Sequence, residues 1–534
     1  MTTIPKGKGR ARPYHSDLST PLLRLSPSSY FRLEDAVRSV AVFGSTGSGK
    51  TSGAGTALAS AYLRAGMGGC VCIAKPEDVE LWQSYAKAAG REDDLVLLGE
   101  GAPNAFNFID YELKAQGIAG LGSVTECLMQ VLDAERIVMP NAGASSSAFW
   151  DRTQRQLINN SLPFLYSAWG NVRIDDLYRF VTDYPPTEAA AETGEWQANS
   201  YMFETWVKAA ENPAHPIEEE LRQKMTRYWV KEIGKSDEKT RANITLNFTS
   251  AIERFLSGRL RDLFCRGTTI TPEDTFRDGK IIVLSMPVLS WREDGIIGQH
   301  VFKYMFQRAV LRRMTLPEEY RRRPVFLWAD EAQFMVSHKD AEYQSACRSM
   351  NAATVYLTQS MPSYKAALGK DSDAATQQLL GNFATKVFHS NGDVHTNEWA
   401  ANTIGKALQM RRNISQGTST SDSNGTSVSF GNSTGTTGGF RSIFGGKQRQ
   451  SENSSSTTQS YNDGEGANRS RSVGMTQSQG ASEQMDYIVQ PSVFANELRT
   501  GGRTNGLKVD CIWFQTGRRF EETERGYLPT TFQQ

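Results

Sequence analysis

The sequence contains no apolar run as long as a membrane-spanning helix, and its first residues lack the apolar stretch of a secretory signal peptide. None of its six cysteines belongs to a C-x-x-C pair or has a histidine at zinc-binding spacing, which argues against a disulfide scaffold and a zinc site. Basic residues are not in excess either, because 59 Lys and Arg against 58 Asp and Glu give a formal net charge of +1. Any contact with nucleic acid must therefore come from a local basic patch. We expect a cytoplasmic protein with buried, reduced thiols.

The length and composition indicate more than one globular domain. A chain of 534 residues is longer than one hydrophobic core usually supports. Hydrophobic residues at 39% and charged residues at 22% are typical of a soluble globular protein. No internal repeat of fixed period is visible. Two or more domains of ordinary globular type are therefore expected.

One motif stands out near the N-terminus. The apolar stretch Val40–Phe43 is followed by GSTGSGKT and then by small residues that favour a helix. This matches the phosphate-loop pattern G-x-x-x-x-G-K-[ST] at every fixed position; the flanking strand and helix argue against a chance match in a Gly-rich turn. Backbone N–H groups of such a loop surround a β-phosphate, the lysine reaches the β- and γ-phosphates, and the threonine hydroxyl binds Mg²⁺. ATP and Mg²⁺ are thus the expected ligands. The predicted nucleotide-binding residues are Gly44, Ser45, Thr46, Gly47, Ser48, Gly49, Lys50 and Thr51, with Thr51 also a metal ligand.

A phosphate loop requires an acidic partner at the end of another strand. The apolar stretch Val325–Ala329 ends in Asp330 and Glu331. We predict that Asp330 lies on the metal side and that Glu331 is the general base that polarises the attacking water. Lys50 and Asp330 are 280 residues apart, which leaves room for an inserted domain.

Two further residues are candidates for catalysis. Gln359 follows the predicted strand Thr354–Leu357, whose end would deliver its side chain to the γ-phosphate; the alternative is an ordinary loop or capping glutamine. Arg348 lies on a predicted helix over 341–350. It is either an arginine finger offered to a neighbouring subunit or a surface charge.

The order of apolar segments predicts an α/β fold with a mostly parallel, doubly wound sheet. Apolar positions at i, i+3, i+4 and i+7 spacing predict an all-helical insert over residues 117–265. Residues 35–116 and 266–534 would then form the nucleotide-binding domain. The predicted strands cover residues 40–43, 69–74, 94–98, 280–286, 324–330, 354–357, 384–389 and 508–514.

Two segments are predicted to lack a fixed structure. Residues 414–482 are dominated by Ser, Thr, Gly, Asn and Gln, and a disordered loop is expected because such a segment buries too little apolar surface to offset its ordering entropy. Residues 1–34 are rich in Pro, Ser and Arg and are expected to form a flexible basic arm; an electrostatic contact with DNA or acidic lipid is the alternative. The basic residues of this arm are Lys6, Lys8, Arg10 and Arg12.

Phosphate loop, helical insert, Asp-Glu strand and Gln-bearing strand, in this order, resemble the type IV secretion coupling proteins, the ring-forming DNA-pumping ATPases of bacterial conjugation. Phe149-Trp150 resembles the family's pFW signature, residues 380–406 its segment leading to a conserved glycine, and residues 489–498 its late Pro/Glu-Leu segment. Asn104–Asn107 resembles its Asn-Pro region without the proline, and Ala74–Glu77 (AKPE) departs from its Asp-Pro-Lys-Gly run.

The resemblance implies a RecA-like P-loop ATPase domain with an all-helical insert, assembled as a homo-hexamer. It also implies DNA-stimulated ATP hydrolysis, DNA that is single-stranded during transfer, and contacts with a relaxase or relaxosome and with secretion-channel proteins. Arg348 precedes the Gln strand as an arginine does in the family, which favours the finger. Family members usually begin with a pair of transmembrane helices, which this sequence lacks. A cytoplasmic location, or a peripheral one at the inner membrane reached through a partner protein, is therefore expected.

Two other functions remain open at this point. One is a ring translocase of the chromosome-partition or DNA-processing type, which shares the same core. The other is an ATP-binding adaptor that recruits substrates for secretion. The intact Glu331 argues against the adaptor, because a purely structural nucleotide site needs no general base.

Overall fold

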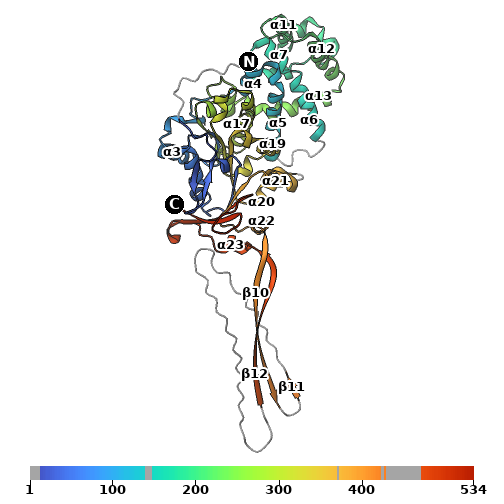
Figure 1. Ribbon diagram of the computed structural model, residues 1–534. Coiled ribbons are helices and arrows are strands. Elements are labelled where there is room, and N and C mark those ends of the chain that lie inside the picture. The colour runs from blue at the N-terminus through green and yellow to red at the C-terminus, as the bar shows by residue number, and fades with distance from the viewer. Residues whose placement is uncertain (1–12, 139–146, 370–371, 423–425, 429–470) are drawn as a thin grey trace, which may run out of the picture.

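A nine-stranded sheet forms the centre of the computed structural model, with helices on both faces, a group of helices beyond one end and a long arm of paired strands at the other (Figure 1). The structure describes residues 13–138, 147–369, 372–422, 426–428 and 471–534. In this part of the chain, no helix has both the length and the apolar character that crossing a membrane requires.

The sheet is parallel except at one edge. Its strand order is β14-β13-β9-β3-β8-β7-β4-β6-β5; β13 runs antiparallel to both β9 and β14, and the other neighbours pair in parallel. The predicted α/β fold with a mostly parallel sheet is thereby confirmed. The strands are β3 (Val40–Phe43), β4 (Gly68–Cys72), β5 (Leu95–Gly99), β6 (Ile281–Ser285), β7 (Val325–Ala329), β8 (Ala352–Thr358), β9 (Thr385–Phe388), β13 (Lys508–Gln515) and β14 (Tyr527–Gln533).

Both faces of the sheet are buried, which is why its parallel strands are continuous apolar runs. Successive residues of a strand point to opposite faces, so Val40 and Val42 lie in one buried cluster and Ala41 and Phe43 in the other. Helices α2 and α3 cover the first face, and α17 covers the second. The helices outside the interval between β5 and β6 are α1 (Leu33–Ala36), α2 (Thr56–Arg64), α3 (Glu77–Ala88), α16 (Val288–Trp291), α17 (Glu293–Arg312), α18 (Glu318–Arg322), α19 (His338–Ala346), α20 (Met361–Leu368), α21 (Ser372–Gly381), α22 (Val394–Ile404) and α23 (Pro491–Asn496).

Between β5 and β6, the described residues form helices and no strand. These helices gather at the end of the molecule opposite the arm (Figure 1). Their apolar side chains join the cluster under α17, so the helical part is packed directly on the sheet domain. The predicted boundaries at residues 117 and 265 stay a prediction. The helices are α4 (Phe108–Gln116), α5 (Leu121–Val138), α6 (Ser147–Asn159), α7 (Leu162–Trp169), α8 (Ile174–Thr182), α9 (Glu188–Ala191), α10 (Gly194–Asn199), α11 (Tyr201–Glu211), α12 (Glu219–Arg227), α13 (Glu238–Ile252), α14 (Gly258–Phe264) and α15 (Glu273–Arg277).

The prediction of a flexible arm over residues 1–34 is wrong from residue 13 onward. Strands β1 (Pro21–Arg24) and β2 (Tyr30–Arg32) form an antiparallel hairpin that leads into α1. Phe31 anchors the hairpin: it is fully buried, with its ring centroid 5.3 Å from that of Trp513. The burial of Phe31 against Trp513 holds this segment in place, although most of the residues around Phe31 are polar. Lys6, Lys8, Arg10 and Arg12 lie outside the described residues.

The prediction of disorder over residues 414–482 is wrong at both ends of the segment. Strand β10 (Lys406–Asp422) pairs along its whole length with β12 (Arg471–Tyr487), and β11 (Thr426–Val428) pairs with the end of β10. These strands form the arm that projects from the body (Figure 1). Strand pairing satisfies the hydrogen-bonding N–H and C=O groups of the main chain, and it does so without a hydrophobic core. Residues 423–425 and 429–470 lie outside the described part.

Shortening the arm should leave the body intact. Deleting residues 418–480 keeps the pairs from Lys406↔Tyr487 to Arg412↔Ala481 and closes them with residues 413–417. Because the core clusters lie in the body, we expect the melting temperature to change by less than about 2 °C. Differential scanning calorimetry measures this directly. A fall of more than about 5 °C would show that the removed residues pack against the body.

Candidate nucleotide-binding site

The predicted phosphate loop, acidic strand end and Gln359 meet at the carboxyl edge of the sheet. They follow β3, β7 and β8, and β8 lies between the other two in parallel register. The side chains that follow these strands therefore converge. They border a cavity of about 510 Å³, whose lining includes Thr46, Gly47, Gly49, Lys50, Thr51, Glu331, Gln333 and Gln359.

The loop itself is shaped by close backbone packing. Gly49 has a φ of +84°, and a Cβ there would lie 2.6 Å from Val509 Cγ1 of β13. Only glycine tolerates both the left-handed backbone and this contact. Gly44 is equally crowded, because a Cβ there would lie 2.3 Å from Ser48 Oγ. Of the eight loop residues, Thr46, Gly47, Gly49, Lys50 and Thr51 line the cavity.

Two contacts join the two halves of the predicted site. Lys50 Nζ lies 3.3 Å from Glu331 Oε1, and Thr51 Oγ1 donates a hydrogen bond of 3.3 Å to Asp330 Oδ2. The two residues predicted to hold a metal ion are therefore adjacent. In the described residues, no group of three or more His, Cys, Asp and Glu side chains could hold a metal ion alone. A hydroxyl and one carboxylate suit a Mg²⁺ ion that takes its remaining oxygens from phosphates and water.

The two carboxyl groups differ in their electrostatic surroundings. Burial raises the pKa of Asp330 to about 6, although the positive charge of Lys50 opposes this shift. Burial also acts to raise the pKa of Glu331, but the charge of Lys50 and hydrogen bonds from Gln333 and Gln359 lower it overall. Glu331 is therefore ionised at neutral pH, the state in which a general base can accept a proton.

Two glutamines orient Glu331. Gln359 Nε2 lies 3.3 Å from both carboxylate oxygens of Glu331, and Gln333 Nε2 donates to Glu331 Oε2 at 2.8 Å. Gln333 is itself fixed by Thr358, whose hydroxyl donates to Gln333 Oε1 at 2.8 Å. Sequence reasoning missed Gln333. The one feature of the sequence that could have indicated Gln333 is its position two residues after Glu331. The turn of the backbone at Glu331 brings the two side chains together.

A second missed residue connects the phosphate loop to its neighbouring strand ends. Asn391 follows β9; its Oδ1 accepts from Ser45 Oγ at 3.2 Å, and its Nδ2 donates to the Gln359 carbonyl at 2.7 Å. Gly392 N also donates to Ser45 Oγ at 3.0 Å. Asn391 thus joins the loop after β3 to the residue after β8. Sequence alone gives no sign of this, because the contact spans 346 residues.

Arg348 is the one predicted catalytic residue that lies apart. It is exposed on the 3₁₀ turn Cys347–Met350, which precedes β8, whereas Gln359 follows the other end of that strand. Seven strand residues separate the two ends by roughly 23 Å. The guanidinium therefore does not belong to the cavity of its own chain.

Comparisons with known proteins bear on the family and the fold. Residues 324–439 match a family model described as the TraM recognition site of TraD and TraG. Of the curated proteins, none matches the sequence. Among solved structures, the bacterial conjugative coupling protein TrwBdeltaN70 in its unbound monoclinic form has a TM-score of 0.51 at 14% identity, covering 94% of this chain and 86% of that chain.

Two further solved structures are similar at lower scores. TrwB in complex with a non-hydrolysable ATP analogue has a TM-score of 0.46 at 14% identity, over 76% of this chain and 86% of that one. VirB4 of Thermoanaerobacter pseudethanolicus has a TM-score of 0.39 at 13% identity, over 74% and 88%. The resemblance predicted from the motifs is confirmed at the level of the fold: the chain has the fold of the solved coupling protein TrwBdeltaN70, and residues 324–439 match the TraD/TraG model.

Proposed function

We propose that this protein is an ATP-hydrolysing ring motor that couples a DNA substrate to a conjugation or type IV secretion channel. The observation that carries the proposal is the contact of Glu331 with Lys50 and Gln359. It supports the proposal because Lys50, Glu331 and Gln359 border one cavity, as a phosphate-binding cation, a base and an orienting amide would have to. The coupling-protein fold and the TraD/TraG segment support the biological role.

Each residue at the cavity has a distinct task in this proposal. The loop N–H groups and Lys50 would bind the β- and γ-phosphates of ATP, and Thr51 and Asp330 would hold Mg²⁺. The bound ion would neutralise negative charge on the phosphates. Glu331 accepts a proton from the attacking water, while Gln333 and Gln359 fix the direction of its carboxylate. The cavity therefore supplies every side chain that hydrolysis requires except one. The missing group is a cation at the γ-phosphate, which would come from outside the chain.

That outside cation would be Arg348 of a neighbouring subunit in a homo-hexamer. Its exposure and its distance from its own cavity fit a role across a subunit boundary. The further partners we propose are DNA, single-stranded during transfer, a relaxase or relaxosome and secretion-channel proteins. The description of the 324–439 model as a TraM recognition site supports a relaxosome-related partner.

The rate of ATP hydrolysis with single- and double-stranded DNA, measured together with the mass in solution, tests this function. We expect DNA to stimulate hydrolysis and a mass of about six chains under the same conditions. Stimulation only by double-stranded DNA would favour a chromosome-partition or DNA-processing translocase. Nucleotide binding without any turnover would favour the adaptor and would overturn the motor.

Lys50→Ala should weaken ATP binding. Hydrogen bonds to charged groups contribute about 1.5–3 kcal/mol, so the Kd should rise about 10- to 150-fold. Titration with a fluorescent ATP analogue measures this, and circular dichroism checks the fold. Lys114→Ala is the matched control, because Lys114 is an exposed lysine on α4 that pairs with Asp110. Wild-type affinity in a folded Lys50→Ala protein would refute the assignment of the phosphate loop.

A further inference from the structure

Helix α17 carries a row of buried polar side chains in an otherwise apolar setting. Gln299, His300, Lys303 and Gln307 are all at most 3% exposed. Lys303 follows Gln299 by four residues and His300 by three, and Gln307 follows Lys303 by four, so they share one face of the helix. Buried polar groups need hydrogen-bond partners, so this face of α17 must be hydrogen-bonded to other parts of the chain.

Gln299 bonds the main chain of Ile73 and Met286, whereas the partners of the other three lie in the segment that follows Glu331. Lys303 Nζ donates to the Met335 carbonyl and to Asp340 Oδ2, the latter at 2.7 Å. His300 Nε2 lies 3.0 Å from the Phe334 carbonyl oxygen and donates to it. The Lys303 and Asp340 side chains are 1% and 0% exposed, so this ion pair is shielded from water and salt.

Asp340 is a junction for several elements. It accepts from Gln307 Nε2 at 2.7 Å and from the Tyr356 hydroxyl of β8 at 2.8 Å. It also accepts from Ser337 N at 2.6 Å, which completes a capping box at the start of α19. The positive charge of Lys303 therefore sits against a carboxylate that is fully hydrogen-bonded. Such a network is rigid, since every member has a fixed partner.

The segment that this network holds in place is a tight turn that begins at Glu331 and includes Phe334 and Met335. Phe334 N donates to the Glu331 carbonyl at 3.0 Å, and Met335 N donates to the Ala332 carbonyl at 2.9 Å. Glu331 itself has a φ of +47°. A left-handed backbone at a residue other than glycine is uncommon and persists only where the surroundings hold it.

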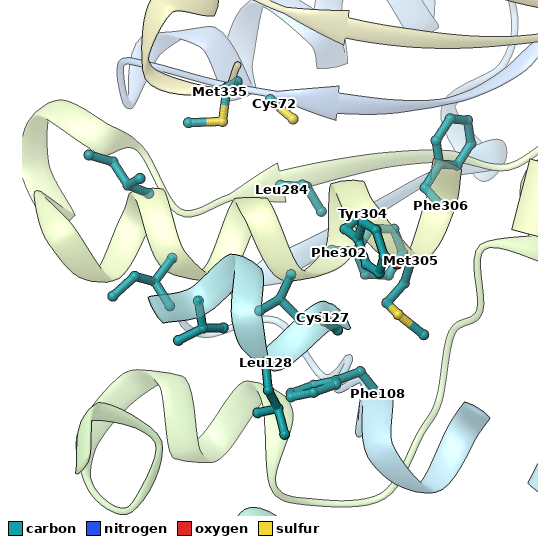
Figure 2. Packing of buried hydrophobic residues seen from close by; sticks show 14 of the residues in the cluster. Cys72, Phe108, Cys127, Leu128, Leu284, Phe302, Tyr304, Met305, Phe306 and Met335 are labelled. Atoms are coloured by element: carbon teal, nitrogen blue, oxygen red, sulfur yellow. The ribbon is translucent and has the colours of Figure 1, made fainter. Parts of the chain in front are cut away.

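The opposite faces of α17 are held by the helical part of the chain. Figure 2 shows Phe302, Tyr304 and Met305 of α17 between Leu284 and Met335 on the sheet side and Cys127 and Leu128 of α5 on the other. Hydrogen bonds also hold the C-terminal part of α17. Arg308 Nη2 donates to Ser123 Oγ at 3.0 Å, and Arg312 Nη1 donates to both carboxylate oxygens of Glu112 at 2.7 Å.

We propose that Lys303 is a positioning residue for hydrolysis, which holds the turn that carries Glu331 against α17 and so ties the base to the helical part of the chain. This inference rests on the proposed function, in which Glu331 is the general base. A role in stability alone is the competing explanation. It would lower the melting temperature without separating turnover from nucleotide affinity.

Lys303→Met tests the inference, because it keeps an unbranched side chain only one atom shorter and removes the donor. We expect the kcat for ATP hydrolysis to fall about 10- to 100-fold, since small misplacements of catalytic groups have effects of this size. The Kd for ATP should stay within about twofold of wild type, because Lys50 and the loop are untouched. Lys303→Arg, which keeps the charge, should recover part of the lost rate.

Lys303→Met leaves Asp340 buried without its cation, so the variant could fail to fold. Lys303→Met combined with Asp340→Asn removes both charges and keeps the cap of α19; the same loss of kcat is expected. Lys114→Met is the matched control on an exposed lysine. A folded single or double variant with wild-type kcat would overturn the positioning role. If the wild-type protein showed no ATP hydrolysis, the proposed function would fail instead, so the two failures are distinguishable.

Discussion

Glu331→Gln should bind Mg²⁺ and ATP as the wild type does and hydrolyse ATP about 10²- to 10⁴-fold more slowly. The amide has the shape of the carboxylate but cannot accept the proton of the attacking water. Its oxygen can still accept hydrogen bonds from Gln333 and Gln359, so its orientation is expected to be kept. Steady-state turnover and ATP affinity, measured on the same sample, separate the two properties.

The matched control is Glu342→Gln. Glu342 is an exposed acid on α19, paired with Lys339 at the surface, and its loss should leave turnover unchanged. Loss of ATP affinity in Glu331→Gln, with turnover per bound nucleotide unchanged, would contradict the role of Glu331 as a base. It would point instead to the pairing of Glu331 with Lys50 as a structural contact.

Arg348→Ala should lower ATP hydrolysis by about 10³- to 10⁵-fold while ATP affinity stays at the wild-type level. A guanidinium at the γ-phosphate stabilises the charge that develops during transfer, and contributes in this range for the reaction class. Because Arg348 and Gln359 flank opposite ends of β8, which spans roughly 23 Å, the proposed finger would act on the cavity of another subunit. Turnover should therefore depend on assembly.

Mixing provides the decisive control for this role. Arg348→Ala and Lys50→Ala proteins, each impaired alone, should regain activity together, since some interfaces then combine an intact loop with an intact arginine. Arg322→Ala, an exposed arginine on α18 paired with Glu318, should have no effect. An active Arg348→Ala protein would reject the role, as would a lack of rescue in mixed rings of proven composition.

The central sheet was predictable because its strands are local signals. Val40–Phe43 and Val325–Ala329 are short apolar runs bounded by Gly, Pro or acidic residues, and burial on both faces leaves no other composition for them. β14 was missed because its burial alternates and it contains Pro529, a residue that strands tolerate only at an edge. At the opposite extreme, β10 and β12 pair through main-chain bonds, which composition does not encode.

The candidate site divides in the same way. Lys50, Asp330 and Glu331 were predicted because their roles require fixed residue types at fixed places after strands, and the structure brings them together. Asn391 and Lys303 act through contacts between segments far apart in the sequence, whose residue types alone suggest nothing. Arg348 lies outside the cavity of its own chain, so its proposed role as an arginine finger stays a prediction.

The attachment of the arm has a simple geometric consequence. Asn391, which bridges the phosphate loop and Gln359, is followed at once by α22 and then by β10, so the arm begins one short helix away from the cavity. At about 3.3 Å per residue, the 17 residues of β10 span roughly 55 Å. A tilt of about 5° at the base would therefore sweep the far end of β10 through about 5 Å. The same tilt would move the base of the arm, next to the cavity, by far less. At the far end the displacement would be about as long as one turn of an α-helix.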